Sequence, residues 1–248
     1  MYKRQGRASG AGLTYVDAEL LAAAVTELDA LGFSVHMHTI GDRAVRNALD
    51  AVAAARRRNG PPPHFETQRP RHHLAHIQLV QPDDIPRFAQ LGVTANCQAF
   101  WAKHEPQMDE LTVPFIGAQR ARLQYPFESI RACGGRLAMG SDWPVTTADP
   151  LQQIEVAVTR VAHEERTSPP FLPGERLGLD DAVDAFTVGS AYVNHDDEAG
   201  RLAVGSRADL VVLDRDIFAP GYGTAARYPV ADARVVMTMV AGEVVYEA

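Results

Sequence analysis

The 248-residue chain has few of the features that mark secreted, membrane-spanning or nucleic-acid-binding proteins. Its two cysteines, Cys97 and Cys133, are too few for a disulfide framework, so we expect reduced thiols and a cytoplasmic protein. No apolar run approaches the roughly 18 residues that a membrane-spanning helix needs. The net charge of −7 argues against a nucleic-acid partner, because such proteins usually carry a basic face.

The chain does contain a regular alternation of short apolar runs and amphipathic helical patterns. The runs predict strands over 33–38, 73–77, 92–97 and 136–140. The helical patterns lie over 17–31, 42–59, 82–91, 119–133, 150–165 and 179–192, and 98–118 is irregular. This alternation is typical of a parallel α/β sheet or barrel. From about residue 200 the pattern changes to strands over 208–214, 234–240 and 244–246, with a hairpin turn at Ala241-Gly242-Glu243.

Three motifs place histidine or aspartate at the end of a predicted strand. They are Val35-His-Met-His-Thr-Ile-Gly-Asp42, His72-His-Leu-Ala-His76 and Gly140-Ser-Asp-Trp-Pro144. In a parallel α/β barrel, side chains at the carboxyl ends of the strands converge on one mouth of the barrel. Two imidazoles and one carboxylate that converge there could bind a divalent metal.

These motifs, together with the tail sequences GRLAVGSRADLVVLDRD and ARVVMTMVAGEVVYE, resemble the amidohydrolase superfamily and within it the YtcJ-like branch (amidohydrolase family 3). The resemblance implies a distorted (β/α)8 TIM-type barrel flanked by a β-sandwich. It also implies that His38, His76 and Asp142 are metal ligands, with zinc as the expected ion. Where the family more often has Glu-His on the sixth strand, this chain has Ala75-His76.

The chain resembles only the C-terminal half of such proteins, because the family's first His-x-His strand has no counterpart in it. We therefore expect residues 1–198 to form a partial barrel and residues 199–248 to add strands of the sandwich. A half-barrel leaves unpaired strand edges and an apolar face, which favour association. The expected partner is a second copy of the chain or a separate N-terminal half.

The resemblance further implies a metal-dependent hydrolase of non-peptide C–N bonds, acting on a small amide-like substrate. Asp142 would be the base that takes a proton from the attacking water. The alternative hypothesis is a catalytically inert chain that acts as a subunit or an interaction module. A Ser-His-Asp hydrolase built on Ser141 is disfavoured, because no Gly-x-Ser-x-Gly turn surrounds this serine.

Further residues are candidates for the substrate pocket. His36 lies two positions before His38 and so points to the same strand face, where it could line the pocket or simply pack. Gln98, Trp101 and His104 belong to the irregular segment and could line the pocket as well. His72 and His73 begin a strand and are predicted to be structural. Asp42 is predicted to be a helix N-cap.

Overall fold

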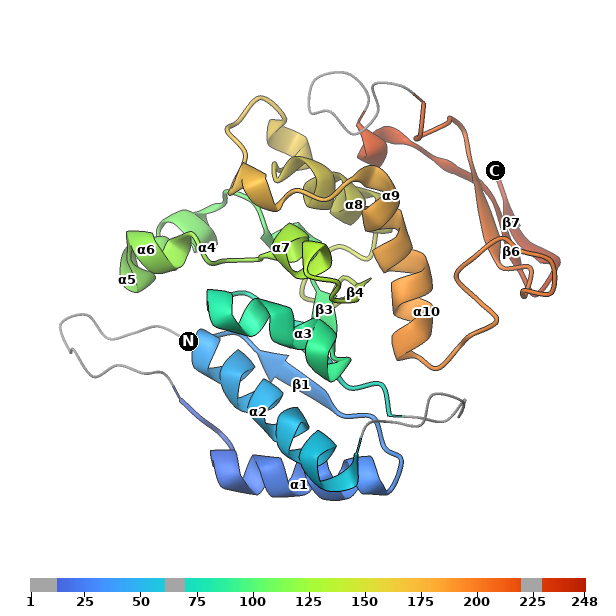
Figure 1. Ribbon diagram of the computed structural model, residues 1–248. Coiled ribbons are helices and arrows are strands. Elements are labelled where there is room, and N and C mark those ends of the chain that lie inside the picture. The colour runs from blue at the N-terminus through green and yellow to red at the C-terminus, as the bar shows by residue number, and fades with distance from the viewer. Residues whose placement is uncertain (1–12, 61–69, 220–228) are drawn as a thin grey trace. The chain divides into compact units, whose positions relative to one another are not determined.

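The computed structural model describes residues 13–60, 70–219 and 229–248 of the chain (Figure 1). The chain divides into two compact units. The first comprises Met1–Cys97 and His104–Leu137, and the second comprises Gln98–Lys103 and Ala138–Ala248. The domain boundary predicted between residues 198 and 199 stays a prediction.

The first unit is built from short parallel strands and helices. Its elements are α1 (Ala18–Ala30), β1 (His36–Thr39), α2 (Asp42–Asn59), β2 (His73–His76), η1 (Pro82–Asp84), α3 (Ile85–Leu91), β3 (Thr94–Cys97), α4 (Pro106–Asp109), α5 (Val113–Ile116), α6 (Ala118–Ala121) and α7 (Phe127–Ala132). β1 pairs with β2 and β2 with β3, both in parallel. The strand order is β1-β2-β3-β4, and β4 (Leu137–Met139) begins at the last residue of the first unit. The predicted α/β class with a parallel sheet is confirmed.

The helical spacing of Ala44, Val45, Ala48, Leu49 and Val52 predicts the inner face of α2. This face is confirmed, since Val45, Leu49 and Val52 are fully buried. The single helix predicted over 119–133 is wrong, because the structure has two short helices there, α6 and α7. Tyr125 separates them with a positive φ of 47°. It precedes Pro126, and the proline ring disfavours the α conformation of the residue before it.

Helix α1 begins as predicted but buries a different face. The Asp17 carboxylate accepts hydrogen bonds from the amides of Glu19 and Leu20, which caps the helix. The helical spacing of Leu20, Leu21, Ala24, Leu28 and Leu31 predicts an apolar stripe that faces the core. In the structure Leu20 is 66% exposed and Leu31 is 71% exposed, so this prediction is wrong. The helix instead buries Val25, Thr26 and Asp29, and it packs beside α2.

A buried polar cluster explains why α1 packs through this face. The Asp29 carboxylate accepts from Arg56 Nη1 at 2.7 Å, Asn59 Nδ2 at 2.8 Å and His72 Nε2 at 2.9 Å. His72 is fully buried, and its Nδ1 accepts from the Val35 amide at 3.1 Å. The neutral imidazole with its proton on Nε2 satisfies both bonds. The prediction that His72 is structural is therefore confirmed.

This geometry predicts a pH-dependent stability. Burial lowers the pKa of His72 below its usual value of 6.5, and this effect outweighs the hydrogen bond to Asp29, which raises it. Below about pH 6.5 the unfolded chain binds a proton that the folded chain does not, so stability is full above that pH and falls below it. We expect the urea midpoint to drop between pH 7.5 and 5.5, and to drop less in His72→Gln. An equal drop in both proteins would contradict the prediction.

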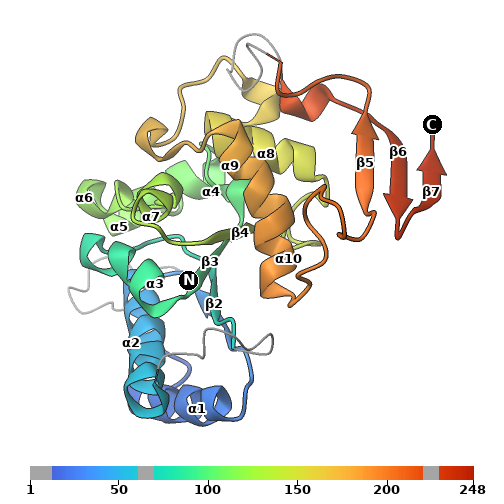
Figure 2. The ribbon, with the colours of Figure 1, turned by 45° about the vertical axis from the view of Figure 1, so that its right-hand side comes forward.

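The second unit carries the remaining helices and an antiparallel sheet. Its elements are η2 (Ala99–Trp101), α8 (Pro150–Thr159), η3 (His163–Glu165), η4 (Pro173–Glu175), α9 (Leu179–Asp184), the π-helical turn η5 (Ala185–Gly189), α10 (Ser190–Val193), β5 (Leu210–Leu213), η6 (Val230–Asp232), β6 (Val235–Val240) and β7 (Glu243–Glu247). Figure 2 shows β5, β6 and β7 as neighbouring strands in that order.

The predicted hairpin between β6 and β7 is confirmed. Ala241 and Gly242 form its two-residue turn, with φ angles of 50° and 87°. Positive φ at both positions is what a type I′ turn requires, and this turn matches the twist of the two strands. Across the parts of the chain that the structure describes, none of the helices combines the length and apolar character that crossing a membrane demands.

Candidate metal centre

The two predicted histidine ligands meet at the ends of neighbouring strands in the first unit. His38 Nδ1 lies 2.7 Å from His76 Nε2, and the ring centroids are 4.8 Å apart. His38 lies in β1 and is exposed to solvent. His76 is the last residue of β2 and is buried. The two ring nitrogens lie within hydrogen-bond distance of each other, one on a buried ring and one on an accessible ring, and so form a candidate metal-binding pair.

The backbone at the end of β2 brings His76 to this position. The strand register pairs His38 with Ala75 and Thr39 with His76, so an extended His76 would share the face of Thr39. His76 instead has a φ of 77°, and the following Ile77 has a φ of 51°. Positive φ is rare for a residue other than glycine and is unfavourable for a β-branched residue such as Ile77. Rotation about the N–Cα bond turns the His76 side chain toward His38. Such backbone outliers are concentrated at functional sites.

Asp142, the third predicted ligand, lies in the second unit. It follows β4 in an exposed turn and also has a positive φ, of 54°. The turn is closed by the hydrogen bond from the Val145 amide to the Asp142 carbonyl at 2.8 Å. The structure therefore brings together two of the three predicted ligands, and the role of Asp142 stays a prediction.

Two more histidines extend the pair along the same strands. The His36 ring lies 5.3 Å from the His38 ring in an edge-on arrangement, as expected for residues two apart on one strand face. His36 also lies 4.6 Å from the ring of His73, its register partner on β2. This contact was not predicted, although two strands that each carry a histidine at matching positions could have indicated it.

The remaining pocket candidates lie in different units. Gln98 is buried and Trp101 is half-buried, and both belong to the η2 region of the second unit. His104 lies in the first unit, where its Nδ1 is 2.8 Å from Asp109 Oδ1 and its side chain is 43% exposed. A shared pocket of His36, Gln98, Trp101 and His104 stays a prediction.

The predicted capping role of Asp42 is wrong by one residue. Gly41 occupies the N-cap of α2, and Asp42 is the first helical residue. The Asp42 carboxylate is instead engaged by side chains from other segments, namely Gln81 and Arg120. No local sequence pattern indicates these partners, which lie 39 and 78 positions away.

The donor atoms at the pair suit a transition metal. Neutral imidazole nitrogens are common ligands of zinc and of its neighbours in the periodic table. Two donors are fewer than the three protein ligands of a typical catalytic zinc site. Within residues 13–60, 70–219 and 229–248, no group of three or more histidine, cysteine or acidic side chains is placed to hold a metal. The first unit brings two of the predicted ligands together, and a metal site that includes Asp142 stays a prediction.

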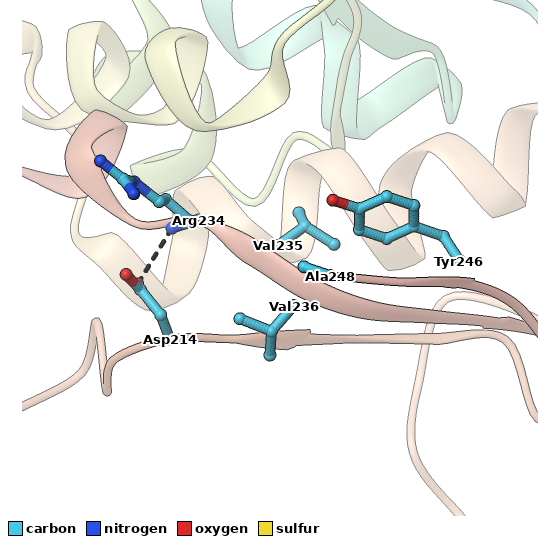
Figure 3. Close-up of a pocket in the computed structure, with 6 residues that line it drawn as sticks. All are labelled: Asp214, Arg234, Val235, Val236, Tyr246 and Ala248. Carbon is cyan, nitrogen blue, oxygen red and sulfur yellow. Dashed lines mark hydrogen bonds between the residues drawn. The ribbon is translucent and has the colours of Figure 1, made fainter.

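A separate hollow lies on the C-terminal sheet of the second unit (Figure 3). Its lining residues are Asp214, Arg234, Val235, Val236, Tyr246 and Ala248. The Asp214 carboxylate binds Arg215 and also accepts from the Arg234 amide at 3.0 Å, and these bonds hold its pKa well below the usual value. None of the predicted ligands lines this hollow, and its carboxylate is already paired.

The chain is a parallel α/β protein with a histidine pair at the ends of adjacent strands. Many metal-dependent hydrolases share this fold class. Comparison with known families makes this specific. The model of the amidohydrolase family matches residues 4–246, and the chain belongs to that family. The predicted resemblance is confirmed.

The chain is similar to three relatives and to one solved structure. It is 32% identical over 206 residues to the protein LONG AFTER FAR-RED 3 of Arabidopsis thaliana (82% of this chain, 33% of the relative). It is 28% identical to the putative amidohydrolase YtcJ of Bacillus subtilis (95% and 42%) and 28% identical to the N-substituted formamide deformylase of Arthrobacter pascens (75% and 32%). An uncharacterised metal-dependent hydrolase from Pyrococcus horikoshii OT3 aligns with a TM-score of 0.69 and 26% identity (87% and 41%).

The coverage is unequal between the chain and its relatives. The matches extend over most of this chain but over only 32–42% of the length of those three relatives. The family is therefore established, whereas the activity of the chain is a matter for proposal.

Proposed function

We propose that the chain provides metal-binding residues of a hydrolase that cleaves non-peptide C–N bonds. The observation that carries this proposal is the convergence of His38 Nδ1 and His76 Nε2 to 2.7 Å at the ends of adjacent strands. Both histidines belong to strand-end motifs whose resemblance to the family predicts metal binding. Family membership and the likeness to a metal-dependent hydrolase support the same function.

In this proposal His38, His76 and Asp142 would hold one divalent ion, with zinc as the expected metal. Such an ion supplies Lewis acidity toward a carbonyl group and makes water reactive near neutral pH. His76 is buried and contributes a ring nitrogen in a fixed position, while His38 presents its nitrogen from the accessible side. Asp142 accepts a proton from the attacking water and returns it to the nitrogen that leaves. For an amide or a formamide, the products are a carboxylic acid and an amine.

The expected substrates are small amides, N-substituted formamides or cyclic ureas. The deformylase among the relatives supports the formamides most directly. The site is tested with metal-free protein to which Zn²⁺ is restored, using an N-substituted formamide and measuring formate release. Release that depends on both Zn²⁺ and His76 supports the proposal. If Zn²⁺ binds without producing hydrolysis of any of the three substrate classes, the proposed reaction is wrong for this chain.

A second candidate function is that of a subunit which pairs with another polypeptide. The exposed apolar side chains of the first unit favour it: Leu31 is 71% exposed and Phe33 is 59% exposed. These two side chains lie close together in the sequence, and it is contiguous apolar surface that marks an interaction site. The partner would be a second copy or a chain that supplies further barrel strands. Light scattering coupled to size-exclusion chromatography tests this candidate, and a purely monomeric chain that hydrolyses formamide alone would exclude it.

A further inference from the structure

One carboxylate in the first unit joins three segments that lie far apart in the sequence. Asp42 Oδ1 accepts from its neighbour's amide, Arg43 N, at 3.0 Å and from Arg120 Nη2 at 2.8 Å. Asp42 Oδ2 accepts from Gln81 Nε2 at 2.6 Å. Both oxygens are therefore used, and each distance is that of a strong hydrogen bond.

Two of the three segments follow the ends of the histidine-bearing strands. Asp42 opens α2 directly after the turn that follows His38. Gln81 lies in the connection that follows His76, and the Leu79 amide in the same connection donates to the Ile40 carbonyl at 3.1 Å. The turns after β1 and β2 are thus joined by one backbone bond and one side-chain bond.

Arg120 brings the third segment, which spans residues 104–122 and carries the pocket candidate His104. Arg120 lies in α6, and its side chain is 34% exposed, compared with 21% for Asp42. Its Nε is buried and has no hydrogen-bond partner within the described part of the chain, so the contact through Nη2 is the one that fixes the guanidinium group. Farther along, the Val80 amide donates to the Leu123 carbonyl at 3.2 Å, which continues the same junction.

We propose that Asp42 is a positioning residue, whose carboxylate fixes the strand-end turns beside His38 and His76 and anchors segment 104–122 to them. For the metal site, this inference rests on the proposed function. The carboxylate is needed because an asparagine in its place has one acceptor oxygen instead of two. The NH2 group of that asparagine would face either the amide donor of Gln81 or the guanidinium of Arg120. The half-buried guanidinium of Arg120 would also lose its counter-charge.

The test compares Asp42→Asn and Arg120→Gln with the matched control Asp50→Asn. Asp50 lies on the same helix and pairs with Arg87 at 2.6 Å, but it is 59% exposed and contacts neither strand-end turn in the described structure. Each protein is titrated with Co²⁺ alone, and both the affinity and the d–d absorption bands are recorded. Loss of residues that orient metal ligands typically weakens metal binding by ~10–100-fold. We expect a loss of about tenfold or more and shifted bands in both test variants, with the control within about twofold of the parent chain.

Hydrogen–deuterium exchange of the metal-free proteins provides a second readout that does not depend on the proposed function. We expect faster exchange in the turn at 39–42 and in segment 104–122 for Asp42→Asn, and unchanged exchange there for Asp50→Asn. If the parent chain binds no Co²⁺, the proposed function fails, and the exchange data alone decide the positioning role. If the parent chain binds Co²⁺ but Asp42→Asn matches the control in affinity, spectrum and exchange, the inference is overturned. If Asp42→Asn does not fold, Arg120→Gln removes the same ion pair and decides the question.

Discussion

Replacing His76 with alanine is expected to lower the affinity of the chain for Zn²⁺ by more than about 100-fold. His76 is buried, and its Nε2 lies 2.7 Å from His38 Nδ1, so its removal leaves a single imidazole at this position. Loss of an outer hydrogen-bond partner alone typically weakens metal binding by ~10–100-fold, and loss of a ligand costs more. Isothermal titration with Zn²⁺ under a competing chelator measures the difference.

His73→Asn is the matched control for this prediction. His73 lies on the same strand and is half-buried, but its Nδ1 contacts the Arg71 carbonyl at 3.1 Å and its ring lies against His36. Its replacement is expected to change Zn²⁺ affinity by less than about tenfold, which is below the range for a ligand. Equal losses in the two variants would show that β2 as a whole, rather than His76 as a ligand, determines the affinity.

Replacing Asp29 with alanine is expected to destabilise the chain by about 3–5 kcal/mol. The side chain of Asp29 is 5% exposed and accepts bonds from Arg56, Asn59 and His72, which come from α2 and from the start of β2. Without the carboxylate, the Arg56 guanidinium stays largely buried and loses its counter-charge. Urea unfolding followed by circular dichroism measures the free energy of unfolding.

Asp50→Ala is the appropriate comparison, because Asp50 also pairs with an arginine but at an exposed position. Exposed pairs contribute about 0–1 kcal/mol, so the control is expected to unfold close to the parent chain. If Asp29→Ala costs no more than Asp50→Ala, the buried cluster does not hold α1 against α2.

Much of the site framework was predictable because it depends on local patterns. Histidines that end apolar runs predicted the strands that carry His38 and His76, and the two-residue spacing of His36 and His38 placed both on one face. The hairpin followed from Ala241-Gly242, where the turn chemistry is local. These features need only a few neighbouring residues to define them.

The features that were mispredicted depend on partners distant in the sequence. The leucines of α1 indicated a core-facing stripe, but the bonds of Asp29 to residues 27 to 43 positions away determine which face is buried. Asp42 stands where the local sequence predicts a helix N-cap. Its partners Gln81 and Arg120 come from distant segments of the chain. The turn that directs His76 toward His38 depends on positive φ angles at His76 and Ile77, which neither residue type favours.

The central claim is that His38, His76 and Asp142 share one metal ion. Anomalous diffraction at the zinc absorption edge from crystals grown with Zn²⁺ tests it most directly. The account predicts one strong peak about 2.0–2.2 Å from a ring nitrogen of each histidine and from a carboxylate oxygen of Asp142. A zinc peak bound elsewhere, with these three side chains directed away from one another, would contradict it.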